Sequence, residues 1–122
     1  MAGFIQRNQW TDFLNDFTKR NQFRATRLEI DGELGAEEEA EYLPLLGVSF
    51  DPKGTDAGSV GVILGGETAS DDRHLEHVIM QVERIAPITG VQGVEDGLAF
   101  EDGSGNKTLL TFQELPEIPA QT

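Results

Sequence analysis

The stretch that decides the fold is residues 98–112, LAFEDGSGNKTLLTF, in which two runs of alternating side chains flank a polar turn. Leu98 and Phe100 alternate with small or charged neighbours before the turn, and Leu110 and Phe112 do so after it. A period of two is typical of a strand that buries one face. The glycine-rich segment between the runs predicts that they pair as an antiparallel β-hairpin.

The same alternation recurs upstream, in residues 24–31, 46–50 and 60–64. The last two of these runs are separated by a segment that begins with Asp51-Pro52-Lys53-Gly54, residue types of a type I turn. We therefore expect them to be antiparallel neighbours. The apolar side chains that we expect to face the core are Leu28, Ile30, Leu46, Val48, Phe50, Val60, Val62 and Leu64.

Before these strands, the spacing of large apolar residues predicts an amphipathic helix. Trp10, Phe13, Leu14 and Phe17 stand at positions i, i+3, i+4 and i+7, which share one helical face. Asn8 or Thr11 is expected to provide the N-cap oxygen. The aromatic face requires an apolar surface to cover, and the predicted sheet supplies one.

Residues 70–85 fit two patterns. Leu75, Val78, Ile79, Val82 and Ile85 follow a helical stripe, whereas Val78, Met80 and Val82 alternate as in a strand. Periodicity slightly favours a helix, while the β-branched residues favour a strand. The residues alone leave both open.

These elements predict an α+β domain, in which an N-terminal amphipathic helix packs on a mostly antiparallel sheet of about five to six strands. The sheet is expected to form two layers with the helix or to be partly barrel-like. The 122 residues suit a single domain, 1–122. The acidic residues 32–42 are expected to form a mobile exposed loop. The proline-containing tail, 114–122, is expected to be frayed.

Charge is the strongest compositional feature, because 22 Asp and Glu face nine Lys and Arg, giving a formal net charge of −13. Such a chain repels nucleic-acid phosphates and anionic membranes and attracts basic proteins. It has no cysteine, and neither a secretory signal nor an apolar run long enough for a membrane helix is evident. We therefore expect a soluble, cytoplasmic protein.

The histidines offer the one cluster that suggests a metal. His74 and His77 would share a face on a helix, with Asp71 and Asp72 nearby, but would lie on opposite faces of a strand. A second pattern, Asp102-x-Ser104-x-Asn106, imitates the start of a calcium loop. It lacks the required glycine and final glutamate, so a hairpin turn is the better interpretation. No catalytic, cofactor-binding or metal-binding residue is assigned.

Several segments together resemble a family of small, mainly bacterial proteins classified only as a domain of unknown function. The resemblance rests on residues 43–51 (LPLLGVSFD), 77–79 (HVI), 98–103 (LAFEDG) and 108–112 (TLLTF), and spans about residues 8–113. The family pattern has a proline where this chain has Val82. Tolerance of proline implies that residues 75–85 are a strand, which disfavours the two-histidine site. The resemblance implies no activity or cofactor.

The leading hypothesis from the sequence is a non-enzymatic binding or regulatory module. It would meet a basic protein partner through its acidic surface or an exposed sheet edge. One alternative is a small enzyme or metal-binding protein that uses His77 with nearby carboxylates. Another is an acidic mimic of nucleic acid that inhibits a DNA-binding protein.

Overall fold

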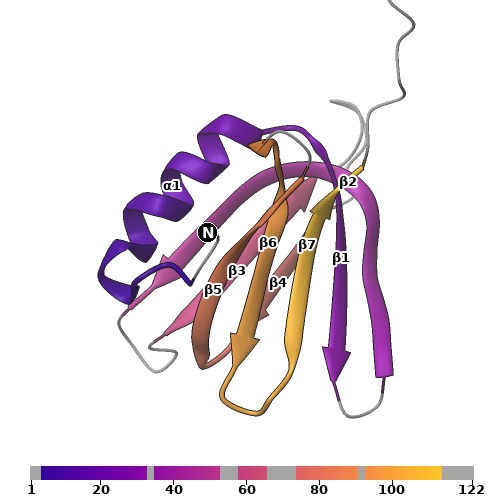
Figure 1. Cartoon of the computed structure of the whole chain (residues 1–122). Coiled ribbons are helices and arrows are strands. Elements are labelled where there is room, and N and C mark those ends of the chain that lie inside the picture. The colour runs from indigo at the N-terminus through magenta and orange to yellow at the C-terminus, as the bar shows by residue number, and fades with distance from the viewer. Residues whose placement is uncertain (1–3, 33–34, 53–57, 66–73, 91–92, 114–122) are drawn as a thin grey trace, which may run out of the picture.

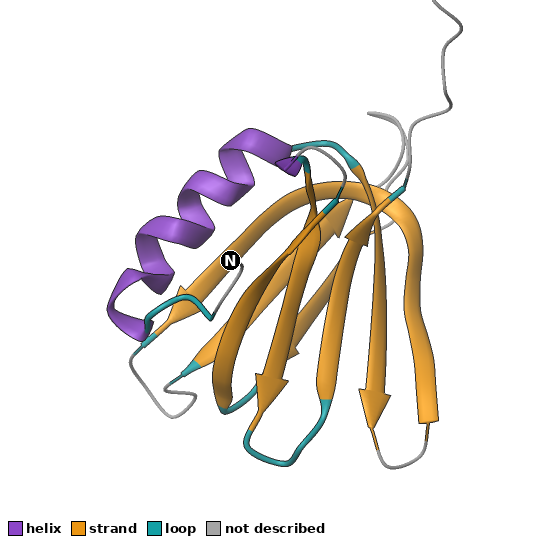
Figure 2. Ribbon diagram, in the orientation of Figure 1, coloured by secondary structure: helices purple, strands orange, loops and turns teal. Residues whose placement is uncertain are grey.

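A computed structural model describes residues 4–32, 35–52, 58–65, 74–90 and 93–113 of the chain. In these residues a short 3-10 turn, η1 (Arg7–Gln9), leads into one α-helix, α1 (Trp10–Asn21), and seven strands follow. The strands are β1 (Ala25–Gly32), β2 (Gly35–Asp51), β3 (Ser59–Gly65), β4 (His74–Ile79), β5 (Val82–Thr89), β6 (Glu95–Asp102) and β7 (Lys107–Phe112). Figures 1 and 2 show a strongly curved sheet with α1 lying across the opening of the curve.

The strands form one sheet in the order β4-β3-β2-β1-β7-β6-β5, and every neighbouring pair is antiparallel. The predicted α+β arrangement, with an N-terminal helix on an antiparallel sheet, is confirmed. The predicted number of strands was too low, partly because residues 75–85 contribute to two strands rather than one. The sheet is also open rather than partly barrel-like, since no ladder joins β4 to β5 in the described part of the chain.

The curvature depends on β2, a single strand of 17 residues. Its first part, up to Pro44, pairs with β1, and its second part, from Leu45, pairs with β3. Tyr42 has a φ of 43°, and the register shifts between Leu45 and Gly47. Irregularities of this kind bend a strand and increase its twist. β2 therefore arches over the molecule and carries the sheet from one side to the other (Figure 1).

The bend changes which side chains of β2 face inward. Leu45 is fully buried and Leu46 is exposed, because the register shift between Leu45 and Gly47 puts Leu45, rather than Leu46, on the buried face with Val48. The prediction that Leu46 faces the core was therefore wrong, whereas Val48 is buried as expected. Val78 and Met80, which alternate with Val82, are also exposed rather than buried. Simple alternation fails wherever a bulge or corner resets the period of two.

The acidic stretch was expected to be a loop at residues 32–42, but most of it is strand. β2 begins at Gly35, and its first residues pair with β1 from Gly32 back to Leu28. Backbone hydrogen bonding to β1 thus prevails over the tendency of dense like charges to stay in an irregular loop. The tail at 114–122 lies outside the described residues, as does most of the predicted turn after Pro52.

One buried layer of apolar side chains lies between α1 and the sheet. Trp10, Leu14 and Phe17 project from the helix and are no more than 1% exposed. The Trp10 ring meets Phe50 edge-on at 4.9 Å, and the Phe17 ring stacks on Phe112 at 5.7 Å. The remaining buried apolar residues, all from the sheet, are Leu28, Leu45, Val48, Val60, Val62, Leu64, Ile79, Val82, Ile85, Leu98, Phe100 and Leu110.

Polar contacts attach the helix at its middle and at its C-terminal end. The Thr18 hydroxyl donates to the Leu14 carbonyl and accepts a 3.0 Å hydrogen bond from the Val48 N–H in the bent part of β2. The predicted N-cap is not found, since the capping position is Gln9, which makes no side-chain hydrogen bond there. The preceding turn η1 leads directly into α1 instead.

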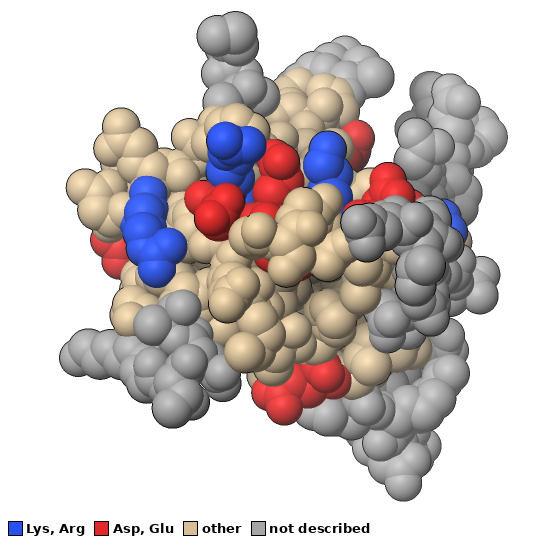
Figure 3. Space-filling view, turned by 90° about the horizontal axis from the view of Figure 1, so that it is seen from below, with Lys and Arg blue, Asp and Glu red and all other residues tan. Residues whose placement is uncertain are grey.

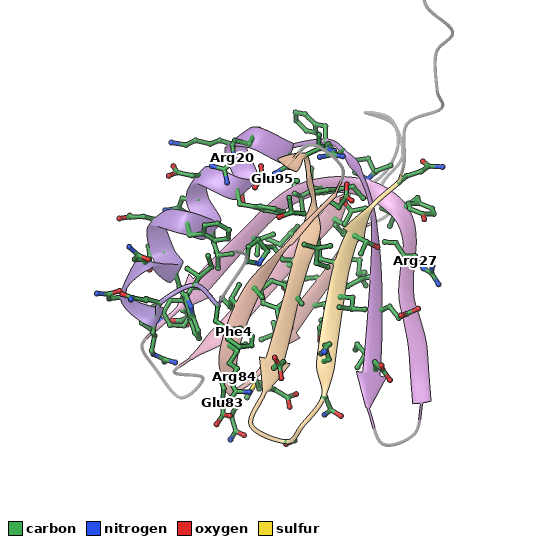
Figure 4. All side chains as sticks on the ribbon, in the orientation of Figure 1. Phe4, Arg20, Arg27, Glu83, Arg84 and Glu95 are labelled. Carbon is green, nitrogen blue, oxygen red and sulfur yellow. The ribbon has the colours of Figure 1, made fainter. Side chains whose placement is uncertain are left out.

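At its C-terminal end, α1 is linked to β6 by an ion pair. The Arg20 guanidinium donates two hydrogen bonds to the Glu95 carboxylate, at 2.8 and 2.9 Å, and Asn21 adds a third at 3.2 Å (Figure 4). The bonds from Arg20 are the main reason that the pKa of Glu95 is lowered below its ordinary value. Both side chains are partly exposed, so solvent screening limits the stabilisation to about 1 kcal/mol or less.

We predict that Trp10→Ala lowers the free energy of unfolding by about 3–5 kcal/mol, because it leaves a cavity between α1 and β2. Phe23→Ala is the matched control, since Phe23 is 67% exposed just after the helix and its loss should cost less than about 0.5 kcal/mol. Urea unfolding followed by far-ultraviolet circular dichroism measures both. Equal losses in the two variants would contradict the buried position of Trp10.

We predict that Glu95→Gln costs about 0.5–1 kcal/mol at neutral pH. Because the folded state lowers the Glu95 pKa, the carboxylate stabilises the protein above its unfolded pKa. That contribution is lost as the pH falls through the folded pKa, so the difference from wild type should vanish in acid. Urea unfolding across this range measures it, with Arg20→Gln as the control background, in which Glu95→Gln should add little. A difference that persists in acid would refute the ion pair.

Candidate functional site

The two edges of the sheet differ in how their backbones are covered. At β5 the N–H of Ile5 donates a 2.7 Å hydrogen bond to the carbonyl of Ile85, so the N-terminal segment lies on this edge. The Arg84 guanidinium stands 5.3 Å from the Phe4 ring centre beside it (Figure 4). Pro87, further along β5, has no N–H to offer a partner strand. The β5 edge is therefore protected against further pairing.

The β4 edge carries no comparable protection within the described residues. β4 pairs with β3 along its whole length, from Val60 opposite Ile79 to Gly65 opposite His74, and it ends the strand order. On this edge strand Val78 is 45% exposed, and Met80, which directly follows the strand, is 49% exposed. A strand with one open side and apolar neighbours is a template for the pairing of another strand.

A two-residue connection, called the corner below, joins the C-terminal end of β4 to β5, which lies at the other end of the strand order. Met80 and Gln81 alone connect β4 to β5, and Gln81 adopts a φ of 54°. The Gln81 carbonyl accepts a 3.0 Å hydrogen bond from the N–H of Gly103 in the β6–β7 turn. Val82 donates to the Gly58 carbonyl at 2.9 Å on the other side. The corner therefore holds β4 and the β6–β7 turn close together.

A hollow of about 260 Å³ lies between β4 and this turn. His77 and Ile79 line it from β4, on the face of the strand that points into the curve of the sheet. Ile30 and Thr108, which pair across β1 and β7, line the opposite wall. In the described part of the chain, the hollow is thus an uncovered part of the concave side and borders the β4 edge.

The β6–β7 turn supplies the polar rim of the hollow through Asp102, Ser104 and Asn106. Oδ1 of Asp102 accepts hydrogen bonds from the backbone N–H groups of Ser104 and Asn106, both at 2.9 Å. Oδ2 accepts a 3.4 Å bond from the Asn106 side-chain amide. These bonds confirm that the calcium-like pattern is a hairpin turn. They also leave Oδ2 as the less engaged of the two carboxylate oxygens.

Charged side chains border this end of the molecule. Figure 3 looks onto the end at which the β6–β7 turn lies and shows an uncharged area, with acidic and basic side chains mixed above it and an acidic group below it. On the convex face the described charges include pairs of opposite sign, Arg27 with Glu29 and Arg84 with Glu101. Among the described residues that line the hollow, none is Lys or Arg.

The histidine cluster is not assembled as a metal site in the described residues. The strand interpretation of residues 75–85 is confirmed, so His74 and His77, three positions apart on β4, belong to opposite faces. Asp71 and Asp72 lie outside the described residues. Among the residues that the structure does describe, no group of three or more His, Cys, Asp or Glu side chains could hold a metal ion. His77 instead lines the hollow.

Sequence reasoning did not find this site. Pro87 was a usable signal that β5 is an edge strand. Nothing in residues 74–79 marks β4 as the other edge, because strand order depends on pairing over long distances. The hollow joins residues of β1, β4 and β7, which no short pattern connects.

In the described residues the fold and site define a small α+β protein with one uncovered sheet edge, and comparison with known proteins places it more closely. A family model described as a family of unknown function (DUF5335) matches residues 2–121. The chain therefore belongs to this family, which agrees with the resemblance seen in its sequence. That description assigns no activity, so the function has to be argued from the site.

An uncharacterized protein of Aquifex aeolicus (strain VF5) is similar to part of the chain, with 40% identity over 50 residues. The match covers 40% of this chain and 45% of the Aquifex protein. No solved structure matches the chain. In the described residues no helix is long and apolar enough to cross a membrane.

Proposed function

We propose that this protein is a non-enzymatic binding module that pairs an extended, basic segment of another protein with β4. The observation that carries the proposal is the contrast between the two edges. β5 is covered at Ile85 and contains Pro87, whereas β4 is bordered by exposed Val78 and Met80. In such strand addition the main-chain hydrogen bonds provide most of the affinity.

The net charge of −13 indicates which partners can approach this edge. A field of this sign speeds the encounter with basic segments and repels acidic ones, with a range of about 8 Å at physiological salt. It also opposes the pairing of β4 with β4 of a second copy. A basic segment of a different protein is therefore the preferred occupant, and the cytoplasm is the location that we propose for the encounter.

The alternatives receive less support. A nucleic-acid mimic requires carboxylates in a regular row on one face, but the described convex face includes the opposite-sign pairs Arg27–Glu29 and Arg84–Glu101. An enzyme or metal protein based on His77 requires further ligands or acid–base partners. Asp102 is the described carboxylate that lines the hollow with His77, and one of its oxygens is held by two backbone N–H groups of the β6–β7 turn. Both considerations favour the binding module.

We predict that a fluorescently labelled heptapeptide of alternating lysine and valine binds the protein, with an affinity that falls as salt is raised. The same peptide with its alternate backbone amides N-methylated keeps its charge but cannot pair as a strand. It should bind at least about tenfold more weakly, because it loses main-chain hydrogen bonds. Fluorescence anisotropy measures both peptides. Equal binding of the two would show plain charge attraction and contradict strand addition.

We predict that Val78→Lys weakens the binding of the lysine–valine peptide about fivefold, because it places a like charge beside the incoming strand. Val94→Lys is the matched control, since Val94 is similarly exposed (52%) but precedes β6, at the opposite end of that strand from the hollow. It makes the same change in net charge and should have less than a twofold effect. Equal weakening by both variants would place the binding surface elsewhere.

A further inference from the structure

The hollow beside β4 lies where the side chains of an added strand would point. Alternate residues of a strand project to the same face as those directly opposite on its neighbour. On β4 the residues of the concave face include His77 and Ile79, and both line the hollow. An added strand therefore directs every second side chain toward the same space. In strand addition such a pocket determines specificity.

The walls of the hollow match a side chain with an apolar stem and a cationic end. Its apolar part includes Ile79 and half-buried Ile30, together with Val78 and Met80. Asp102 and Ser104 place oxygen atoms at its rim, and Thr108 adds a hydroxyl from the wall. The described lining holds neither Lys nor Arg and the chain has a net charge of −13, so an acidic side chain would be repelled. A wholly apolar one would bring no positive charge to the Asp102 carboxylate.

The hydrogen bonds that the Asp102 carboxylate already makes favour lysine over arginine as the side chain bound in the hollow. An arginine guanidinium binds a carboxylate most strongly when both carboxylate oxygens accept hydrogen bonds from it at the same time. Here Oδ1 is already occupied by two backbone N–H groups of the turn, and Oδ2 accepts one 3.4 Å bond from Asn106. A compact ammonium group needs a single charged oxygen and neutral oxygens around it.

We propose that the hollow receives a lysine side chain of the strand added to β4, with its ammonium group at Oδ2 of Asp102. This inference rests on the proposed function, since it names the residue that the same edge selects. The methylene stem lies along Ile30 and Ile79, as lysine stems commonly lie on apolar surfaces. The Ser104 and Thr108 hydroxyls complete the set of acceptors for the three N–H groups.

The test compares three labelled heptapeptides, in which valine alternates with lysine, arginine or norleucine, against the whole chain. In wild type we expect the lysine peptide to bind about fivefold more tightly than the arginine peptide, and the norleucine peptide to bind most weakly. Asp102→Asn keeps an Oδ1 acceptor for the turn but removes the charge. It should weaken the lysine peptide about tenfold and abolish its advantage over arginine.

Glu101→Gln is the matched control for Asp102→Asn. Glu101 is the preceding residue of β6, lies on the opposite face of the sheet beside Arg84, and gives the same change in net charge. It should weaken the lysine peptide less than twofold. Equal effects of the two variants would overturn the lysine site and leave strand addition standing.

The remaining outcomes are also decisive. If wild type binds the lysine and arginine peptides equally, the site is refuted whether or not Asp102→Asn folds, which thermal unfolding will show. If wild type binds none of the three peptides, the proposed function fails together with this inference. Binding of the lysine peptide with the expected preference and the expected loss in Asp102→Asn supports both.

Discussion

The continuous backbone pairing of β2 is the constraint on which the rest of the structure depends. One strand satisfies its hydrogen bonds first with β1 and then with β3, so the two parts of the sheet cannot separate. The bend between them curves the sheet around a single apolar layer, which Trp10, Leu14 and Phe17 of α1 complete. The same bend brings β4 back toward the β6–β7 turn. The open edge and the hollow are therefore consequences of how β2 is bent.

Much of the local structure could be predicted from the sequence, because it depends on the spacing of neighbouring residues. The helical face of Trp10 and Phe17, the hairpin around residues 102–106 and the pairing of residues 46–50 with 60–64 were all expected. The predictions that failed concern features that depend on pairing between strands far apart in the sequence. The register shift at Leu45 turns Leu46 outward, and backbone pairing with β1 draws the acidic residues after Gly35 into a strand. Neither effect leaves a local pattern.

The site could be predicted only in outline. An open edge was expected in general terms, but the division of residues 75–85 into β4 and β5 at opposite edges was not. The corner at Gln81 makes two successive strands the two ends of the sheet, and its positive φ carries a cost of about 1 kcal/mol. Ile5 covers one of these edges, whereas no strand pairs with the other in the described part of the chain. We propose that the net negative charge of the chain selects the partner of the β4 edge, and that the hollow beside this edge binds one of the partner's side chains.

The central claim is that an incoming basic strand pairs with β4 and not with β5. Amide hydrogen exchange, followed residue by residue by nuclear magnetic resonance with and without the lysine–valine peptide, tests it most directly. The account predicts slower exchange at alternate amides between His74 and Ile79, where one side of the strand is open, and no change between Val82 and Thr89. Unchanged exchange in β4 while the peptide is bound would contradict it.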